Sequence, residues 1–266
     1  MLRVAAVQMS SGEDVAANLD KAAALIGRAA SEGAALVLLP ENFGLMARHA
    51  RDKVAARERD ADGPQQTFLA RMARLHRQYV IGGSVPLESD DPSRTRQSLL
   101  VYAPGGERVA RYDKMHLFRF THGDEDYDEA KTIVAGSTPA SFALSCGRVG
   151  LSICYDVRFP ELYRALGDMA LIVVPAAFTA RTGRAHWETL LRARAIENQC
   201  YVLAAAQSGE HPGGRRTYGH SMLVDPWGEI VAEQAEGEGL AVGDVDMSRI
   251  ADVRARLPAF SHRTLT

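Results

Sequence analysis

The sequence predicts an α/β fold in which helices cover mixed sheets. Short apolar runs rich in Val, Leu and Ile recur along the 266 residues, and Gly, Pro or charged residues bound most of them, which is the pattern of strands. Segments of helical period lie between several runs. Some runs are nearly continuous in apolar residues, which indicates burial on both faces. We therefore expect one mixed sheet or two sheets. The predicted strands are 4–9, 34–39, 79–85, 98–102, 149–153, 170–174, 201–205 and 220–224.

Two segments have the apolar spacing of helices, and one segment has the pattern of a hairpin. The side chains that share a helical face are Leu19, Ala23, Ile26 and Ala30 in the first segment, and Trp187, Leu190, Leu191 and Ala195 in the second. The stretch SLLVYAPGGERVARYDK, residues 98–114, predicts two neighbouring antiparallel strands joined through Pro104, Gly105 and Gly106.

Composition narrows the class of protein. We expect one domain over residues 1–266, because no linker or low-complexity segment divides the chain. The 31 basic and 33 acidic residues give a net charge of −2, which does not favour a nucleic-acid partner. Three cysteines are too few and odd in number for a disulfide scaffold, and the start MLRVAAVQMS has no export segment, so we expect a cytoplasmic protein. No apolar run approaches the roughly 18 residues of a membrane span. Neither a Walker loop nor a GxGxxG motif is present, so we expect no nucleotide cofactor.

Three reactive side chains follow predicted strands. Cys154 comes after GRVGLSI, with Pro160 placed in the first turn of a following helix. Glu41 follows ALVLLP, and Lys114 ends the return strand of the hairpin. A thiol is a strong nucleophile only as thiolate and needs a base, and a nearby cation favours the charged form. Glu41 is a candidate base. Lys114 and the backbone N–H of Tyr155 are candidate donors to the oxyanion formed on an amide carbonyl.

Composition alone favours plainer interpretations. A lone cysteine is more often a small buried hydrophobe, a glutamate after Leu-Pro is usually a surface residue, and a lone lysine is usually solvated. A Cys-His dyad that uses His186 or His220 is a further alternative. We interpret Cys146 and Cys200 as structural.

The acidic stretch THGDEDYDEAK begins as a calcium loop does, with Asp124, Asp126 and Asp128 at alternating positions. It lacks the glycine and glutamate that an EF-hand needs at its sixth and twelfth positions. We expect this stretch, with His116 and His122, to form a lid or rim of the pocket, and we expect no metal.

Three motifs resemble, in order, the catalytic motifs of the nitrilase (carbon–nitrogen hydrolase) superfamily. They are LPENF around Glu41, YDKMHLF around Lys114 and SICYDVRFPELYR around Cys154. The resemblance extends from VAAVQM through AHWETLLRARAIENQCYVLAAAQ to TYGHSMLVDPWGE. It implies an α-β-β-α sandwich that forms dimers or larger assemblies. It also implies a cofactor-free Glu-Lys-Cys site that cleaves non-peptide C–N bonds through a thioester, with a second glutamate, Glu129, that orients Lys114 or the substrate.

Within the superfamily, the pattern looks most like the deaminated glutathione amidases and next like the omega-amidases, which act on 2-oxo acid amides. Arg184 stands where those relatives more often have proline, which affects substrate choice rather than the triad. Nitrilases and carbamoylases remain alternatives. So does an inactive binding subunit, although no triad position is lost.

A carboxylate-bearing substrate would suit a guanidinium through bidentate pairing. Arg158 and Arg181 lie in loops after two predicted strands, and we expect them to bind the substrate. Phe178 and Thr179 follow VVPAA and are expected to line the acyl pocket. By analogy, the helix after Cys154 and the segment around Leu257 and Phe260 would form dimer contacts.

Overall fold

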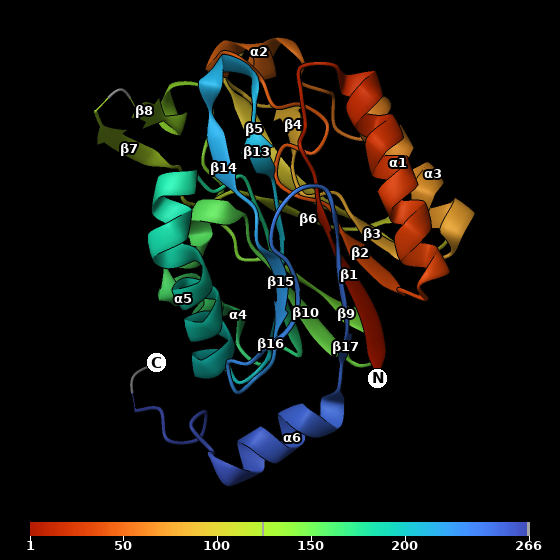
Figure 1. Cartoon of the computed structure of the whole chain (residues 1–266), viewed down its shortest axis with the longest axis vertical. Helices are drawn as coiled ribbons and strands as arrows, with labels where there is room; N and C mark the ends of the chain where they lie inside the picture. Colours follow the sequence, from red (N-terminus) through yellow and green to blue (C-terminus); the bar gives the residue numbers. More distant parts are fainter. Residues whose placement is uncertain (124, 265–266) are drawn as a thin grey trace.

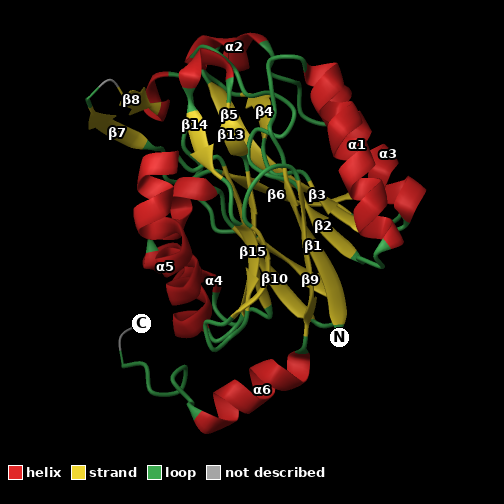
Figure 2. Ribbon diagram, viewed as in Figure 1, coloured by secondary structure: helices red, strands yellow, loops and turns green. Residues whose placement is uncertain are grey.

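The computed structural model describes residues 1–123 and 125–264, and their fold is the predicted α-β-β-α sandwich. Two mixed sheets lie against each other in the middle of the molecule (Figure 1). Helices α1 and α3 cover one outer face, and α4 and α5 cover the other (Figure 2). These helices are α1 Val15–Ser31, α3 Pro64–His76, α4 Pro160–Leu166 and α5 Ala180–Asn198.

The first sheet has the strand order β17-β1-β2-β3-β5-β4, and β6 pairs with β5. Strands β1, β2 and β3 run parallel, whereas β17 and the pairs made by β5 are antiparallel. The predicted hairpin is therefore confirmed as β5 and β6. The strands are β1 Leu2–Gln8, β2 Leu36–Leu38, β3 Tyr79–Ile81, β4 Val85–Glu88, β5 Thr95–Tyr102, β6 Arg108–Asp113 and β17 Gly239–Val245.

The second sheet has the strand order β16-β15-β12-β11-β10-β9. Its centre is parallel, because β10, β11 and β12 are joined by crossovers, and its edges are antiparallel. The strands are β9 Ser141–Leu144, β10 Gly147–Leu151, β11 Leu171–Ala176, β12 Tyr201–Ala206, β15 Ser221–Val224 and β16 Ile230–Gln234.

Shorter elements lie at the ends of the sandwich (Figure 1). One end carries α2, the hairpin of β7 and β8, and the hairpin of β13 and β14, whereas α6 lies at the opposite end. None of the helices in the described part of the chain is long and apolar enough to cross a membrane. The bounds are α2 Ala50–Ala55, β7 Arg119–His122, β8 Glu125–Asp128, η1 Glu129–Lys131, η2 Cys154–Arg158, η3 Pro212–Gly214, β13 Ser208–Glu210, β14 Arg216–Tyr218 and α6 Met247–Arg256.

The alternation of side chains along β1 shows how the layers are built. Val4 and Ala6 point to the core between the sheets, whereas Ala5 and Val7 point to the core beneath α1 and α3. Successive side chains of a strand face opposite sides, and all four are fully buried. The continuous apolar run therefore reports a strand with a core on each side.

Two predicted elements differ from the structure. The predicted strand 79–85 is divided into β3 and β4, because Gly82 and Gly83 break it; β3 pairs with residues 101–102 of β5 and β4 with residues 95–98. The face of α1 is shifted: Leu19, Ala23 and Ala30 are only half-buried. Alanines are spread around this helix, so its sequence leaves the buried face uncertain. The buried side chains are Asn18, Ala22, Leu25, Ile26 and Ala29.

Candidate active site

Glu41 lies three residues beyond β2, and its side chain is buried. The next residue, Asn42, has a left-handed φ of 61°, a conformation that is uncommon for non-glycine residues and that asparagine adopts more readily than most. The backbone N–H of Asn42 donates to Ser84 Oγ at 2.8 Å. Gly83 has a φ of 24°, and a Cβ there would lie 1.9 Å from the carbonyl oxygen of Pro40. Only glycine permits this close approach beneath the Glu41 turn.

Lys114 follows β6 directly and brings its ammonium to Glu41. Its Nζ lies 2.8 Å from Glu41 Oε1 and 3.0 and 2.8 Å from the two carboxylate oxygens of Glu129. Each carboxylate has a second donor: the backbone N–H of Ala177 lies 2.9 Å from Glu41 Oε2, and that of Phe118 lies 2.8 Å from Glu129 Oε2. The lysine side chain is fully buried, so this hydrogen-bonded chain fixes an ammonium between two carboxylates.

The charges of the site hold one another in place. Burial alone would raise the pKa of Glu41, but Lys114, helped by Lys53 and Arg215, outweighs it and lowers the pKa to about 2. Burial would lower the pKa of Lys114, but Glu129 and Glu41 raise it above its usual range. At neutral pH the pair is therefore a carboxylate and an ammonium.

Cys154 has the opposite electrostatic balance. Burial and the charge of Glu41 raise the pKa of its thiol well above the ordinary value, against the opposing effect of Lys114. The resting group is therefore a neutral thiol beside a charged carboxylate. This arrangement suits proton transfer from sulfur to Glu41 at the moment of attack rather than a standing thiolate.

The segment around Cys154 is a strained turn. Strand β10 ends at Leu151, and Cys154 has a φ of 51° and begins the short helix η2. We predicted that the strand runs to residue 153, and the structure ends it two residues earlier. The proline prediction is confirmed, because Pro160 is the first residue of α4.

Asp156 holds this turn and the Lys114 segment together. Its side chain is fully buried. Its Oδ2 accepts from the backbone N–H of Ile153 at 2.8 Å and from Tyr112 Oη at 2.7 Å. Its Oδ1 lies 3.0 Å from the backbone nitrogen of His116 and 2.7 Å from His116 Nδ1. One carboxylate thus joins the strand end before Lys114, the residues after it and the turn of the cysteine.

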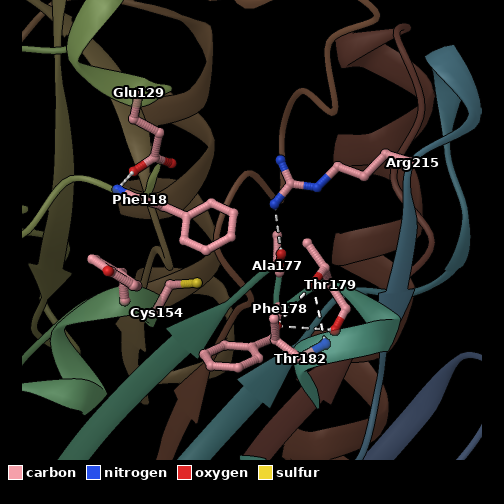
Figure 3. A pocket seen from close by; sticks show the side chains of 9 residues that line it. Phe118, Glu129, Cys154, Ala177, Phe178, Thr179, Thr182 and Arg215 are labelled. Atoms are coloured by element: carbon pink, nitrogen blue, oxygen red, sulfur yellow. Dashed lines mark hydrogen bonds between the residues drawn. The ribbon is translucent and has the colours of Figure 1, made fainter. Parts of the chain in front are cut away.

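The sulfur of Cys154 points into a narrow cavity, which we call the inner cavity (Figure 3). Its volume is about 10 Å³, which is room for about one water. The lining residues are Phe118, Glu129, Cys154, Tyr155, Ala177, Phe178, Thr179, Thr182 and Arg215.

The predicted site residues fall into two groups. Tyr155, Phe178 and Thr179 line the inner cavity with Cys154 and Glu129. Arg158 lies outside its lining, with its guanidinium carbon 5.7 Å from the ring centre of Tyr155 and 5.1 Å from that of Phe178. Arg181 is exposed near the start of α5 and does not line the cavity either.

Two cationic residues near the site were not predicted. Arg215 lines the inner cavity and donates from Nη2 to the carbonyl oxygen of Ala177 at 2.7 Å. Lys53 projects from α2 and interacts electrostatically with Glu41 and Glu129. Both belong to polar segments outside the recognised motifs, and only the folded chain brings them to Cys154.

The other candidate residues lie elsewhere. His186 contacts Arg158 and His220 contacts Glu233, and neither lines the inner cavity. All three cysteines are free thiols, with Cys200 fully buried and Cys146 partly exposed.

The acidic stretch lies on the β7–β8 hairpin, close to the site. Asp124 lies outside the described residues. Asp126 and Asp128 flank Tyr127 on β8, and Asp128 accepts a hydrogen bond from the backbone N–H of Ala130. Within residues 1–123 and 125–264, no group of three or more His, Cys, Asp or Glu side chains is suited to a metal ion.

A buried carboxylate–ammonium pair beside a cysteine at a cavity is the arrangement of a thiol-dependent hydrolase. The chain belongs to the carbon–nitrogen hydrolase family, whose model matches residues 3–255. It is therefore a carbon–nitrogen hydrolase, an enzyme class that acts on amides.

Named relatives agree with this class. A deaminated glutathione amidase of Synechocystis is 42% identical over 97% of this chain and 97% of its own. The human omega-amidase NIT2 is 34% identical over 98% and 94%. The solved NitFhit protein of C. elegans superposes on 99% of this chain with a TM-score of 0.90 and 38% identity. The superposed part makes up 65% of the NitFhit chain.

Proposed function

We propose that this enzyme is a cysteine-dependent amidase that hydrolyses a small carboxylate-bearing amide, deaminated glutathione, through a thioester. The observation that carries the proposal is the Lys114 ammonium held 2.8 Å from Glu41 beside the cavity that contains Cys154. The amidase relative that is 42% identical over nearly the whole chain supports this choice of substrate.

In the first half of the reaction, Glu41 takes the thiol proton as Cys154 Sγ attacks the amide carbonyl carbon. The negative charge moves to the carbonyl oxygen, where the Lys114 ammonium and the backbone N–H of Tyr155 stabilise it. The Tyr155 N–H lies in the first turn of η2, where backbone donors have no partner within the helix. The tetrahedral adduct then collapses, protonated Glu41 gives its proton to the departing nitrogen, and the amine leaves a thioester on Cys154.

In the second half, Glu41 acts as a base again. It takes a proton from a water molecule as the water oxygen attacks the thioester carbon, and the C–S bond breaks with return of the proton to sulfur. Glu129 keeps the Lys114 ammonium charged and pointed at the oxyanion in both halves, since it contacts Nζ through both oxygens.

The mechanism is tested by trapping and by substitution. We expect mass spectrometry to detect an acyl adduct on Cys154 of the enzyme quenched during turnover of deaminated glutathione, and none on Cys146 or Cys200. Cys154→Ala should abolish turnover. Lys114→Ala should lower kcat by about 10²–10³ or more, as for loss of an oxyanion donor. A Cys154→Ala variant with near-native activity, or no adduct on Cys154, would contradict the mechanism.

A second candidate substrate class is the 2-oxo acid amides. The omega-amidase relative, at 34% identity over 98% of the chain, favours it. A panel of deaminated glutathione, 2-oxoglutaramate, a carbamoyl amino acid and a simple nitrile separates the candidates through kcat/KM. An inactive binding subunit would turn over none of them.

We also propose that the chain acts as one domain, in the cytoplasm, as a homodimer or larger assembly that needs no cofactor. Leu257, which is exposed, belongs to the segment that we predict to form a dimer contact. Light scattering coupled to gel filtration measures the assembly directly.

A further inference from the structure

A second, larger cavity adjoins the inner cavity. We call it the outer cavity; its volume is about 250 Å³, and it shares Phe118, Glu129 and Arg215 with the inner cavity. Its wall comes from α2 and the residues before it, the β7–β8 hairpin and the loop at η3. Its remaining lining residues are Ala47, Arg48, His49, Ala50, Lys53, Asp126, Tyr127, Asp128, Thr132, Ile133, Pro212 and Gly213.

The acidic groups of the outer cavity already have partners. Glu129 holds Lys114. Asp128 accepts from the backbone N–H of Ala130, and Asp126 accepts from Thr121 Oγ1 at 2.9 Å. Among the cations of this cavity, Arg48 is paired with Glu13.

Two cations retain donors that no acceptor in residues 1–123 and 125–264 uses. The Nε of Arg215 is buried and has no hydrogen-bond partner within the described chain. Lys53 is half-buried, and its ammonium makes neither a hydrogen bond nor an ion pair with any described residue. A partly buried cation without an acceptor is unfavourable, and a carboxylate supplies the acceptor.

Figure 3 shows the Arg215 side chain extending from the right, with its guanidinium above Ala177 and to the right of Phe118. One nitrogen is held by the carbonyl of Ala177, and the planar group lies 5.2 Å from the ring centre of Tyr127. The guanidinium is therefore held in one orientation before a ligand arrives, which lowers the entropy lost on binding.

Size separates the roles of the two cavities. The inner cavity has room for the reacting carbonyl and little else, so the bulk of an amide larger than a few atoms lies in the outer cavity. We propose that Lys53 and Arg215 bind a carboxylate of the amide substrate that is remote from the scissile bond, and so select anionic amides. This inference rests on the proposed amidase function and names the residues that choose its substrate class. It assigns the recognition to Lys53 and Arg215 in place of Arg158 and Arg181.

The first test measures the anion site without requiring turnover. Cys154 is alkylated with N-iodoacetylglycine, whose carboxylate is remote from the reacting carbon, and with the neutral carboxamide of the same reagent, and the two rate constants are followed by mass spectrometry. Their ratio cancels changes in the thiol pKa, because both reagents consume the same thiolate. We expect the ratio to exceed that of N-acetylcysteine. We expect the ratio to fall by about 10- to 100-fold in Lys53→Met and in Arg215→Gln, because each variant loses one charge-assisted hydrogen bond to the carboxylate.

Matched controls come from neighbouring cations. Lys131→Met removes a lysine that is 67% exposed, and Arg216→Gln removes an arginine that is 73% exposed and adjacent to Arg215. Both should keep the wild-type ratio within about twofold, because solvent and salt screen the charges of exposed side chains. An unchanged ratio in Lys53→Met would overturn the proposal even if Arg215→Gln fails to fold. Lack of reaction at Cys154 with either reagent would overturn it as well.

The second test uses substrates. We expect Lys53→Met to lower kcat/KM for deaminated glutathione by the same factor as the alkylation ratio, mainly through KM. Two forms of deaminated glutathione, one with its glycine carboxylate converted to an amide and the other with its 2-oxo acid carboxylate converted to an amide, identify which carboxylate is bound. The substrate whose kcat/KM is the same in wild type and in Lys53→Met lacks the carboxylate that the site binds. The alkylation ratio could fall in Lys53→Met while the wild-type enzyme turns over neither deaminated glutathione nor 2-oxoglutaramate. That result would refute the proposed function and leave the anion site standing. Equal losses of kcat/KM for all substrates, with a constant ratio, would refute the site.

Discussion

The first prediction concerns Asp156, because four donors contact its one buried carboxylate. They are the Tyr112 hydroxyl, the Ile153 N–H and two nitrogens of His116, all within 3.0 Å. Burial and the charge of Asp156 raise the pKa of Tyr112 above its usual range, so that hydroxyl stays protonated and donates. Asp156→Asn keeps the size but replaces one accepting oxygen with an NH₂ group that faces two donors.

The magnitude follows from the bonds that are lost. A hydrogen bond to a charged group contributes about 1.5–3 kcal/mol, and two such bonds lose their acceptor at Oδ1 or Oδ2. We expect the free energy of unfolding to fall by about 3–5 kcal/mol, in the range for a broken buried charge network. Tyr112→Phe is the matched control, because it removes one donor and keeps the carboxylate. It should cost about 1.5–3 kcal/mol, the contribution of one hydrogen bond to a charged group.

Two assays separate stability from positioning. Urea unfolding at neutral pH, followed through the fluorescence of the buried Trp187, measures the free energy of unfolding. The value of kcat for deaminated glutathione, at a temperature where the variant is fully folded, measures the alignment of Cys154 with Lys114. We expect Asp156→Asn to lower kcat with little change in KM. An unfolding free energy within 1 kcal/mol of wild type, together with unchanged kcat, would refute this reasoning.

Two further predictions concern Glu41 and its turn. The pKa of Glu41 is lowered from 4.5 to about 2, so its carboxylate stabilises the fold above about pH 4.5, and this contribution is lost as the pH falls toward 2. Glu41→Gln should therefore flatten the acid limb of unfolding free energy against pH; an identical limb would contradict the ion pair. Gly83→Ala would place a Cβ 1.9 Å from the Pro40 oxygen, and should lower both the urea midpoint and kcat. Gly12→Ala, where no atom lies within 4 Å, should change unfolding by less than about 0.5 kcal/mol, and equal effects would argue against a special role for Gly83.

The sequence predicts the buried part of this fold well and the edges poorly. Strands β1, β11 and β12 are apolar on both faces and were predicted within two residues of their observed ends. Strand β16 alternates between partly buried and exposed residues, and β17, GLAVGDV, contains two glycines and an aspartate. Their hydrophobic signal is therefore weak, and they were not predicted. The same holds for α3, whose apolar residues are mixed with two buried glutamines, Gln65 and Gln66. Glu58 accepts from the backbone N–H of Gln65 and from the side chain of Gln66.

The candidate site divides in the same way. Glu41, Lys114 and Cys154 could be found because each stands in a motif at a strand end, and the structure brings Glu41 and Lys114 into contact beside the cavity of Cys154. Lys53 and Arg215 could not be found, because their position depends on how α2 and the loop at η3 fold over the sheets. A cation on a polar segment has the same sequence signal whether it faces solvent or a cavity.

The position of the site at the seam of two sheets explains why its geometry depends on the whole sandwich. Glu41 and Lys114 follow strands of the first sheet, whereas Cys154 and Ala177 follow β10 and β11 of the second. The hydrogen bond from Ala177 to Glu41 therefore crosses from one sheet to the other. Because the core between the sheets is closely packed, the sheets cannot slide independently. The left-handed residues Asn42 and Cys154 turn the two segments toward this seam, and the strain at Cys154 is held by the packing that fixes the sheets. Glu41 and Cys154, which are more than a hundred residues apart in the sequence, thus meet because the packing of the two sheets fixes the ends of their strands relative to each other.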